Sequence, residues 1–178
     1  NSKVHLHFQH RCIDLDLDQT SVTFETEEGR RKTRSFDLLI GADGAFSPVR
    51  SAMQITDRFS YSQDYLEHGY KELHIPAAAA GGFVHEKNAL HIWPRESFMM
   101  IALPNPDGSF TATLFFPFDG PMSFSSFSED AQVLTFFRAV FPDAIAHMPS
   151  LLADFNSNPT SSLVTIKCFP WTRNKTLL

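Results

Sequence analysis

A short apolar run that leads directly into a glycine-rich turn constrains the fold of this chain more than any other feature. Residues Phe36–Ile40 are largely apolar and too few for a helix, which predicts a buried strand of an α/β sheet. The turn Gly41–Gly44 follows at once. Ser47 and Pro48 then form a typical helix start, because serine is a good N-cap and proline is tolerated at the first helical position. The local unit is therefore predicted to be strand, turn and helix.

Short strands separated by turns dominate the rest of the chain. Apolar and polar residues alternate over residues 4–18, which predicts one long strand or two strands with a kink. Residues 22–26 predict the next strand, and a third is expected to end in Phe36–Ile40. Later strands are expected at residues 69–75, 90–93, 98–103, 110–116 and 163–169, with helices at residues 130–140 and near 148–155.

Composition limits the classes of partner. Hydrophobic residues make up 43% of the 178 residues and charged residues 20%, as in a globular protein. The net charge of −5 argues against nucleic acid or an anionic membrane as the main partner. The 18 phenylalanines predict either an aromatic core or a pocket for a flat, apolar ligand. The chain has no initiator methionine, and both ends look like strands, so we interpret it as a piece of a longer protein.

Two of the predicted strands form a hairpin whose two faces are both apolar. The two-residue period of a strand places Met99, Ile101 and Leu103 on one face, and pairing Met99 with Phe115 adds Phe115 to that face. The reverse face holds Phe98, Met100, Ala102, Phe110, Ala112, Leu114 and Phe116. Both faces must be covered. We expect the helix around Phe136 to cover one face, and a ligand or another domain to cover the other.

Four potential metal-ligand side chains lie near the N-terminus: His5, His7, His10 and Cys12. On a strand, the first two point away from the last two, so no metal site is predicted. Asp14, Asp16 and Asp18 form an acidic row, which we interpret as a solvated face rather than an acid–base pair. No catalytic residue is assigned within the chain.

Asp43 allows two interpretations. It follows the predicted strand, and the N-terminus of the next helix faces the same crevice, an arrangement that suits an anionic ligand. Its carboxylate could accept hydrogen bonds from a sugar hydroxyl, or it could simply cap the local turn. The residues alone leave both interpretations open, because short glycine-rich motifs are weak signals.

The segment Asp37–Arg50, with the sequence DLLIGADGAFSPVR, resembles the Asp-Gly motif of class A FAD-dependent aromatic monooxygenases. HIWPR at residues 91–95, followed by FMMIALPN at residues 98–105, is more specific and resembles the kynurenine-hydroxylating branch of that family. The resemblance covers nearly the whole chain. It implies an enzyme that converts L-kynurenine to 3-hydroxykynurenine with FAD, NADPH and O₂. The alternatives are a related hydroxylase of another aromatic acid and a non-catalytic module that binds an apolar ligand or a partner protein.

The resemblance also implies site residues. It assigns FAD contacts to Cys12, Asp43, Gly44, Pro48 and Arg50. Cys12 is expected to make a structural contact near the adenosine, without thiol chemistry. An apolar slot for the aromatic ring of the substrate is assigned to Leu90, Met99, Ile101, Leu103 and Phe115.

The implied fold class is α/β (α+β), with part of a Rossmann-like FAD-binding domain joined to a mixed β-sheet substrate domain that has helices on one face. Residues 1–58 are expected to belong to the FAD-binding domain, residues 59–161 to the substrate domain, and residues 162–178 to strands that return to the first domain. The family's G-x-G-x-x-G turn is absent here, so the missing N- and C-terminal parts are expected partners. The expected location is the cytoplasm in a bacterium. In a eukaryote it is the mitochondrial outer membrane, reached through a C-terminal segment outside this chain.

Overall fold

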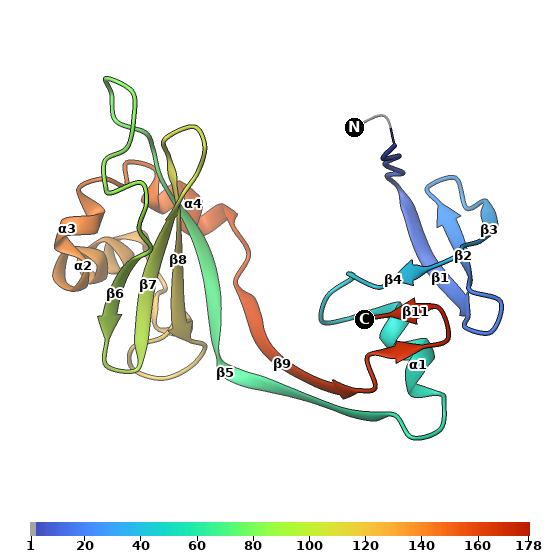
Figure 1. Ribbon diagram of the computed structural model, residues 1–178. Helices are drawn as coiled ribbons and strands as arrows, with labels where there is room; N and C mark the ends of the chain where they lie inside the picture. The colour runs from blue at the N-terminus through green and yellow to red at the C-terminus, as the bar shows by residue number, and fades with distance from the viewer. Residues whose placement is uncertain (1–2) are drawn as a thin grey trace. The chain divides into compact units, whose positions relative to one another are not determined.

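The computed structural model describes residues 3–178, which form two compact units. Unit 1 comprises the described residues up to Asp64 together with Val164–Leu178, and unit 2 comprises Tyr65–Leu163. The described residues contain three β-sheets and a few short helices (Figure 1), so the mixed α/β fold class is confirmed. The assignment of segments to an FAD-binding and a substrate-binding domain stays a prediction.

Unit 1 contains two small sheets and one helix. An antiparallel sheet has the order β1 (His10–Asp16), β2 (Ser21–Thr26) and β3 (Arg31–Ser35). A second sheet pairs β10 (Thr172–Arg173) with β11 (Thr176–Leu177), and β11 pairs in parallel with β4 (Leu39–Ile40). Helix α1 (Pro48–Gln54) begins as predicted, with Ser47 as N-cap and proline in its first turn.

Two predictions in unit 1 are wrong. Residues 4–8 are not a strand. The β1–β2 ladder begins at the pair His10–Thr26, and β2 ends at Thr26, so β2 has no residues left to pair with residues 4–8. The run Phe36–Ile40 is not a buried strand. The third strand ends at Ser35, and β4 comprises two residues whose sole strand neighbour among the described residues is the two-residue β11. Ile40 is therefore 63% exposed.

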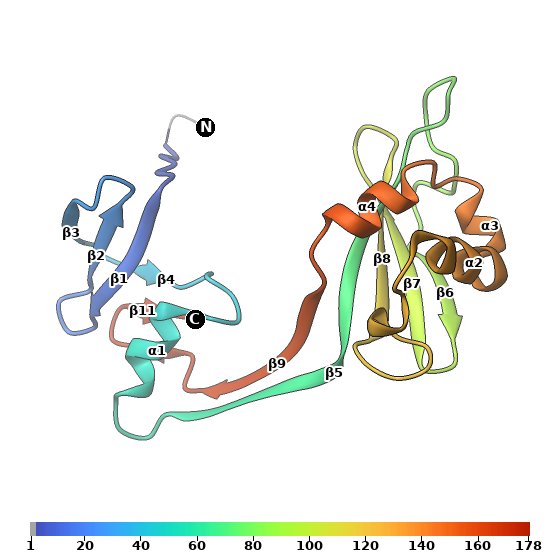
Figure 2. The same cartoon turned by 180° about the vertical axis from the view of Figure 1, so that it is seen from behind.

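Unit 2 is built on a five-stranded sheet with the order β6-β7-β8-β5-β9. Its strands are β5 (Ser60–Ile75), β6 (His91–Arg95), β7 (Phe98–Pro104), β8 (Phe110–Pro117) and β9 (Ser161–Phe169). The first residues of β5, up to Asp64, and the part of β9 from Val164 onward belong to unit 1. The helices are η1 (Phe124–Ser126, a 3₁₀ turn), α2 (Asp130–Val140), α3 (Pro142–Ile145) and α4 (Leu151–Ser157). Helices α2, α3 and α4 lie on one side of the sheet (Figure 2). The predicted strands and helices of this region are confirmed to within a few residues, except that β5 begins at Ser60, nine residues before the predicted start at Gly69.

An aromatic core lies between that side of the sheet and the helices. The reverse face of the predicted hairpin is fully buried, as alternation required, and Phe116 lies at its centre. The Phe116 ring centroid is 4.8 Å from that of Phe98 and 5.1 Å from that of Phe136 on α2. The expectation that the helix around Phe136 covers this face is confirmed.

Candidate functional site

The turn before helix α1 is fixed by hydrogen bonds between side chains and backbone. The backbone N–H of Val49 donates to Asp43 Oδ2 at 3.2 Å, and the N–H of Arg50 donates to Ser47 Oγ at 2.9 Å. The Arg50 guanidinium donates to the carbonyl oxygens of Gly44, at 3.2 Å, and Ala45. Asp43 therefore caps the helix locally, and Arg50 holds the turn in a defined shape.

The same turn borders an open groove of about 410 Å³, which is lined in part by Asp43, Gly44, Arg50, Val164 and Ile166. Gly44 has a φ of +78°, and a Cβ built on it would meet no atom within 4 Å, so the backbone here is open to a ligand. Arg50 Nε is buried and has no hydrogen-bond partner among residues 3–178. The groove thus offers a carboxylate acceptor and an unused guanidinium donor.

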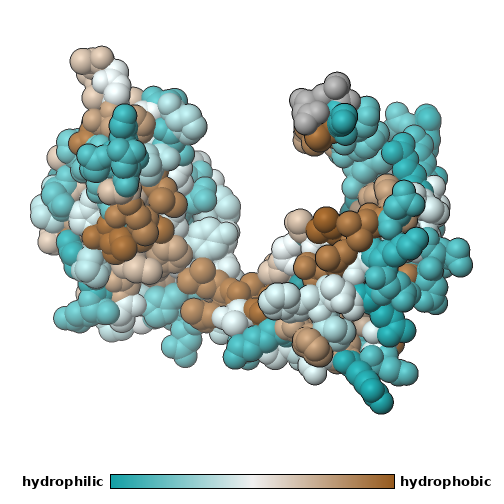
Figure 3. Space-filling view, viewed as in Figure 1, coloured by the Kyte–Doolittle hydropathy of each residue, from teal (hydrophilic) through white to brown (hydrophobic). Residues whose placement is uncertain are grey.

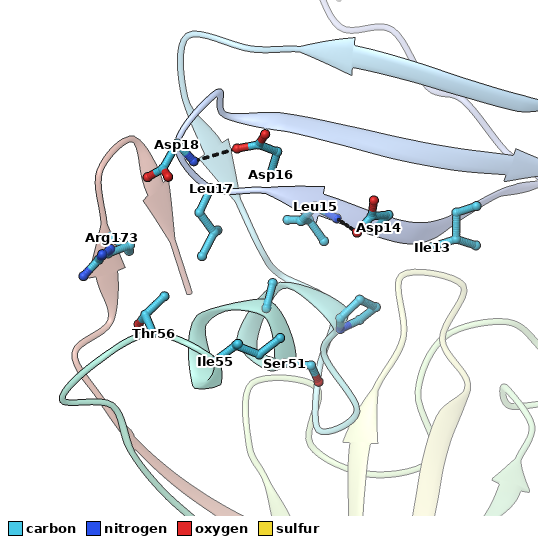
Figure 4. Close-up of a pocket in the computed structure, with 12 residues that line it drawn as sticks. Ile13, Asp14, Leu15, Asp16, Leu17, Asp18, Ser51, Ile55, Thr56 and Arg173 are labelled. Atoms are coloured by element: carbon cyan, nitrogen blue, oxygen red, sulfur yellow. Dashed lines mark hydrogen bonds between the residues drawn. The ribbon is translucent and has the colours of Figure 1, made fainter.

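Cys12 and Pro48 lie elsewhere in unit 1. Cys12 is half-buried on β1, beside a bulge, and burial followed by the nearby Asp43 carboxylate raises the pKa of its thiol. The thiol is therefore protonated at neutral pH and is within the electrostatic reach of Asp43. Pro48 lines a different groove of about 660 Å³, between β1 and α1 (Figure 4). The structure brings Asp43, Gly44 and Arg50 together in one groove, but Pro48 does not line it.

The acidic row also lines the groove of Figure 4. Asp16 Oδ1 accepts the backbone N–H groups of Asp18 and Gln19, both at 2.9 Å, so this carboxylate caps the β1–β2 turn. Asp18 Oδ1 accepts a hydrogen bond from the Asn174 amide at 3.0 Å. These contacts give Asp16 and Asp18 structural partners.

In unit 2, the sheet face opposite the helices carries apolar side chains. Met99 pairs with Phe115 in the β7–β8 ladder, as predicted, which places Met99, Ile101, Leu103 and Phe115 on this open face. Leu103 is 50% exposed, and Met99 is 39% exposed. Figure 3 shows apolar residues gathered on this face. Exposed apolar patches of this kind mark binding surfaces.

Sequence reasoning missed two neighbours of this patch. Ile92 on β6 pairs with Ile101 and is 52% exposed, whereas Trp93 next to it turns toward the core. Alternation along residues 91–95 would have found Ile92. The Tyr70 ring centroid on β5 lies 6.3 Å from that of Phe115. Leu90 directly precedes β6 and is half-exposed, so the five predicted slot residues lie on or beside one face of the sheet.

Two further properties of the described residues bear on function. No group of three or more His, Cys, Asp or Glu side chains within residues 3–178 is arranged to hold a metal ion. Over the same range, no helix combines the length and the apolar character that crossing a bilayer requires.

The sequence and the fold of the chain can also be compared with those of known proteins. No protein-family model matches the chain. It is 52% identical over 166 residues to a kynurenine 3-monooxygenase from Flavobacterium psychrophilum, and 56% identical over 164 residues to one from Dictyostelium discoideum. The aligned residues are 93% and 92% of this chain, but 37% and 35% of those relatives.

Among solved structures, the tetrameric form of 2-methyl-3-hydroxypyridine-5-carboxylic acid oxygenase matches with a TM-score of 0.63 and 20% sequence identity. The match covers 94% of this chain and 42% of that one, and it indicates a shared fold. Identity above 50% along nearly the whole chain carries more information than this fold match. The chain is a sequence relative of the kynurenine 3-monooxygenases, aligned with slightly more than a third of their length.

Proposed function

We propose that the protein hydroxylates the aromatic ring of L-kynurenine, using FAD, NADPH and O₂. The observation that carries this proposal is the 52% identity, over 93% of the chain, to a kynurenine 3-monooxygenase. The open apolar face of unit 2 supports it, because five residues expected to surround an aromatic ring lie on or beside that face.

The groove beside Asp43 fits the chemistry of FAD. A dinucleotide presents hydroxyl groups that need acceptors and phosphate or ring oxygens that need donors. Asp43 offers a carboxylate, Arg50 has an unused buried Nε–H, and Gly44 leaves space for close approach to its backbone. Asp43, Gly44 and Arg50 would therefore hold the cofactor. When bound, FAD supplies the electron transfer and oxygen activation that no side chain can supply.

The chain's own contribution on the substrate side is orientation and exclusion of water. Met99, Ile101 and Leu103 form one row on the open face, and Phe115 lies across from Met99 on the neighbouring strand. A flat aromatic ring placed against this surface would bury apolar area at about 25 cal/mol per Å². Once covered, an apolar surface of this kind would exclude water from the reacting ring.

The substrate assignment is tested with protein expressed from the complete coding sequence. Kynurenine-dependent NADPH oxidation is measured together with the formation of 3-hydroxykynurenine. We expect Phe115→Ala to weaken kynurenine binding or to uncouple NADPH oxidation from hydroxylation, and Thr113→Val on the same face to have a smaller effect. Hydroxylation of another aromatic acid but not of kynurenine would favour a related hydroxylase. The absence of flavin and of turnover with every acid would favour a binding module.

The cofactor assignment has a separate test in the same protein. Asp43→Ala should weaken FAD affinity, or slow flavin reduction by NADPH, by roughly ten- to a hundredfold, the effect of losing one charge-assisted hydrogen bond. Asp37→Ala is the matched control, because Asp37 is an exposed aspartate six residues earlier. FAD titration and stopped-flow reduction give the two values. Unchanged values for Asp43→Ala would leave Asp43 with its helix-capping role alone.

A further inference from the structure

Three histidine side chains from separate segments of unit 2 meet at one edge of its core. His85 belongs to the loop between β5 and β6, His91 begins β6, and His147 lies between α3 and α4. The ring centroid of His85 is 5.1 Å from that of His91 and 5.1 Å from that of His147. We refer to these three residues as the histidine cluster.

His85 lies at the centre of this cluster and is surrounded by rings. Its ring centroid is 5.6 Å from that of Phe110 and 5.9 Å from that of Trp93. Its Nε2 atom is buried and makes no hydrogen bond within residues 3–178. A neutral imidazole can leave this nitrogen as an unprotonated acceptor, whereas an imidazolium would leave a charged donor unpaired. An unpaired buried charge is more costly than an unpaired neutral group.

Three titratable side chains on neighbouring segments act electrostatically on His85. His91 faces it from β6, His147 from the loop after α3, and Asp143 from α3. Burial lowers the pKa of His85 most, the two histidines lower it further, and Asp143 raises it. Asp143 is already engaged, because its Oδ2 accepts the Trp93 Nε1–H at 2.7 Å.

His91 and Arg95 also form hydrogen bonds with the backbone. His91 Nε2 lies 2.8 Å from the carbonyl oxygen of Glu86, which ties β6 to the loop. Arg95, which acts on Asp143, donates its Nε–H and an Nη–H to the carbonyl oxygen of Val140. Among residues 3–178, Asp143 is the carboxylate that favours a protonated His85, and its effect is smaller than those of burial and the two histidines.

We propose that the histidine cluster is an acid-sensitive latch, which holds residues 85–90 against the sheet while the buried imidazole of His85 is neutral and releases them on acidification. The sign follows from linkage. His85 has a lowered pKa in the folded chain, so its contribution to folding is present in full above its unfolded pKa of about 6.5 and decreases as the pH falls from there through the folded pKa.

The released segment ends at Leu90, beside the open apolar face. The loop also contains Gly81 and Gly82, both with positive φ, so its first half has a backbone that few other residues would adopt. The latch concerns the structure of the loop and does not depend on which substrate the open face binds.

Cleavage by a glutamate-specific protease, followed by mass spectrometry of the fragments, tests the proposal in protein expressed from the complete coding sequence. Glu86 lies inside the latched segment, and the exposed Glu28 in unit 1 provides an internal reference. The ratio of the two cleavage rates cancels the pH dependence of the protease. We expect this ratio to rise as the pH falls from 7.5 to 5.5, because protonation of His85 favours the open loop, whose cleavage follows its equilibrium population.

Variants distinguish the latch from general acid loosening. His85→Phe keeps a ring but cannot be protonated, and it should make the ratio independent of pH. His74→Gln, at an exposed histidine on β5, should retain the full response. If His85→Phe does not fold, His147→Gln serves instead, and it should move the midpoint of the response to higher pH. A constant ratio in the unmodified chain, a full response in His85→Phe, or an unmoved midpoint in His147→Gln would overturn the proposal.

Discussion

Phe115 and Phe116 are adjacent residues with opposite environments, and replacing each in turn tests the register of the sheet. The side chain of Phe116 is fully buried. Its ring contacts those of Phe98 and Phe136, and also Phe124 at 5.4 Å between centroids. Removing the ring would leave a cavity among these aromatic side chains, so Phe116→Ala should cost about 3–5 kcal/mol, as for other buried phenylalanines. Phe115 is half-exposed, and Phe115→Ala should cost less than about 1.5 kcal/mol.

Urea unfolding gives the two values. Because the chain has two compact units, the signal must come from unit 2. Trp93 lies in unit 2 and Trp171 in unit 1, so the measurements are made on a Trp171→Phe background. With a slope of about 2 kcal/mol per molar, Phe116→Ala should lower the urea midpoint by about 1.5–2.5 M. Phe116→Leu, at roughly 1–2 kcal/mol, serves if the alanine variant is unfolded. A larger loss for Phe115→Ala than for Phe116→Ala would refute the register.

Two further predictions concern unit 2. Gly69→Ala should destabilise unit 2 by about 1–3 kcal/mol. A Cβ at this position would lie 2.6 Å from the Phe118 ring and 2.9 Å from the Ser161 carbonyl oxygen. An unchanged urea midpoint in the same fluorescence assay would disprove this prediction. The hydrogen bond from Trp93 lowers the pKa of Asp143 in the folded chain. This hydrogen bond should therefore stabilise the fold in full above pH 3.8, the pKa of Asp143 in the unfolded chain, and its contribution should be lost as the pH falls through the lower folded pKa. In Trp93→Phe, the NMR-measured pKa of Asp143 should return toward 3.8, and no change would contradict the assignment.

The hairpin of β7 and β8 could be predicted because every determinant of its register lies inside the two strands. Alternation fixed which residues share a face, and pairing Met99 with Phe115 placed an apolar set on each side. The start of α1 was predictable for the same reason, since Ser47 and Pro48 act on the helix that they begin. Local chemistry was sufficient in both cases.

Strand β4 could not be predicted from its own residues. The apolar run Phe36–Ile40 has the composition of a buried strand, but the extent of a strand depends on the backbone that pairs with it. Among the described residues, the strand that pairs with β4 is β11, which has two residues and lies far from β4 in the sequence. The bulge between Cys12 and Asp14 has the same origin, because the extra residue is defined relative to β2.

The candidate site could be predicted to different degrees in the two units. In unit 2, alternation predicted which residues of the hairpin share a face, and the family resemblance assigned the slot to that face. Ile92 was omitted because alternation was not extended to the strand predicted at residues 90–93. In unit 1, the sequence placed Asp43, Gly44 and Arg50 near one turn but could not show that Arg50 Nε is left unpaired. That property depends on how the guanidinium is shared between the carbonyl oxygens of Gly44 and Ala45.

If the open face binds the substrate as proposed, stability and binding depend on opposite faces of the unit 2 sheet, and the residue number shows which face a side chain is on. Even-numbered residues from Phe98 to Phe116 on β7 and β8 face the aromatic core, and odd-numbered ones from Met99 to Phe115 face outward. The helices bury one face and stabilise the unit, so the other face can remain apolar and accessible without being needed to hold the fold together. Substitutions at odd positions should therefore alter ligand specificity at small cost in stability. Substitutions at even positions should alter stability first, and any effect on binding should follow from unfolding.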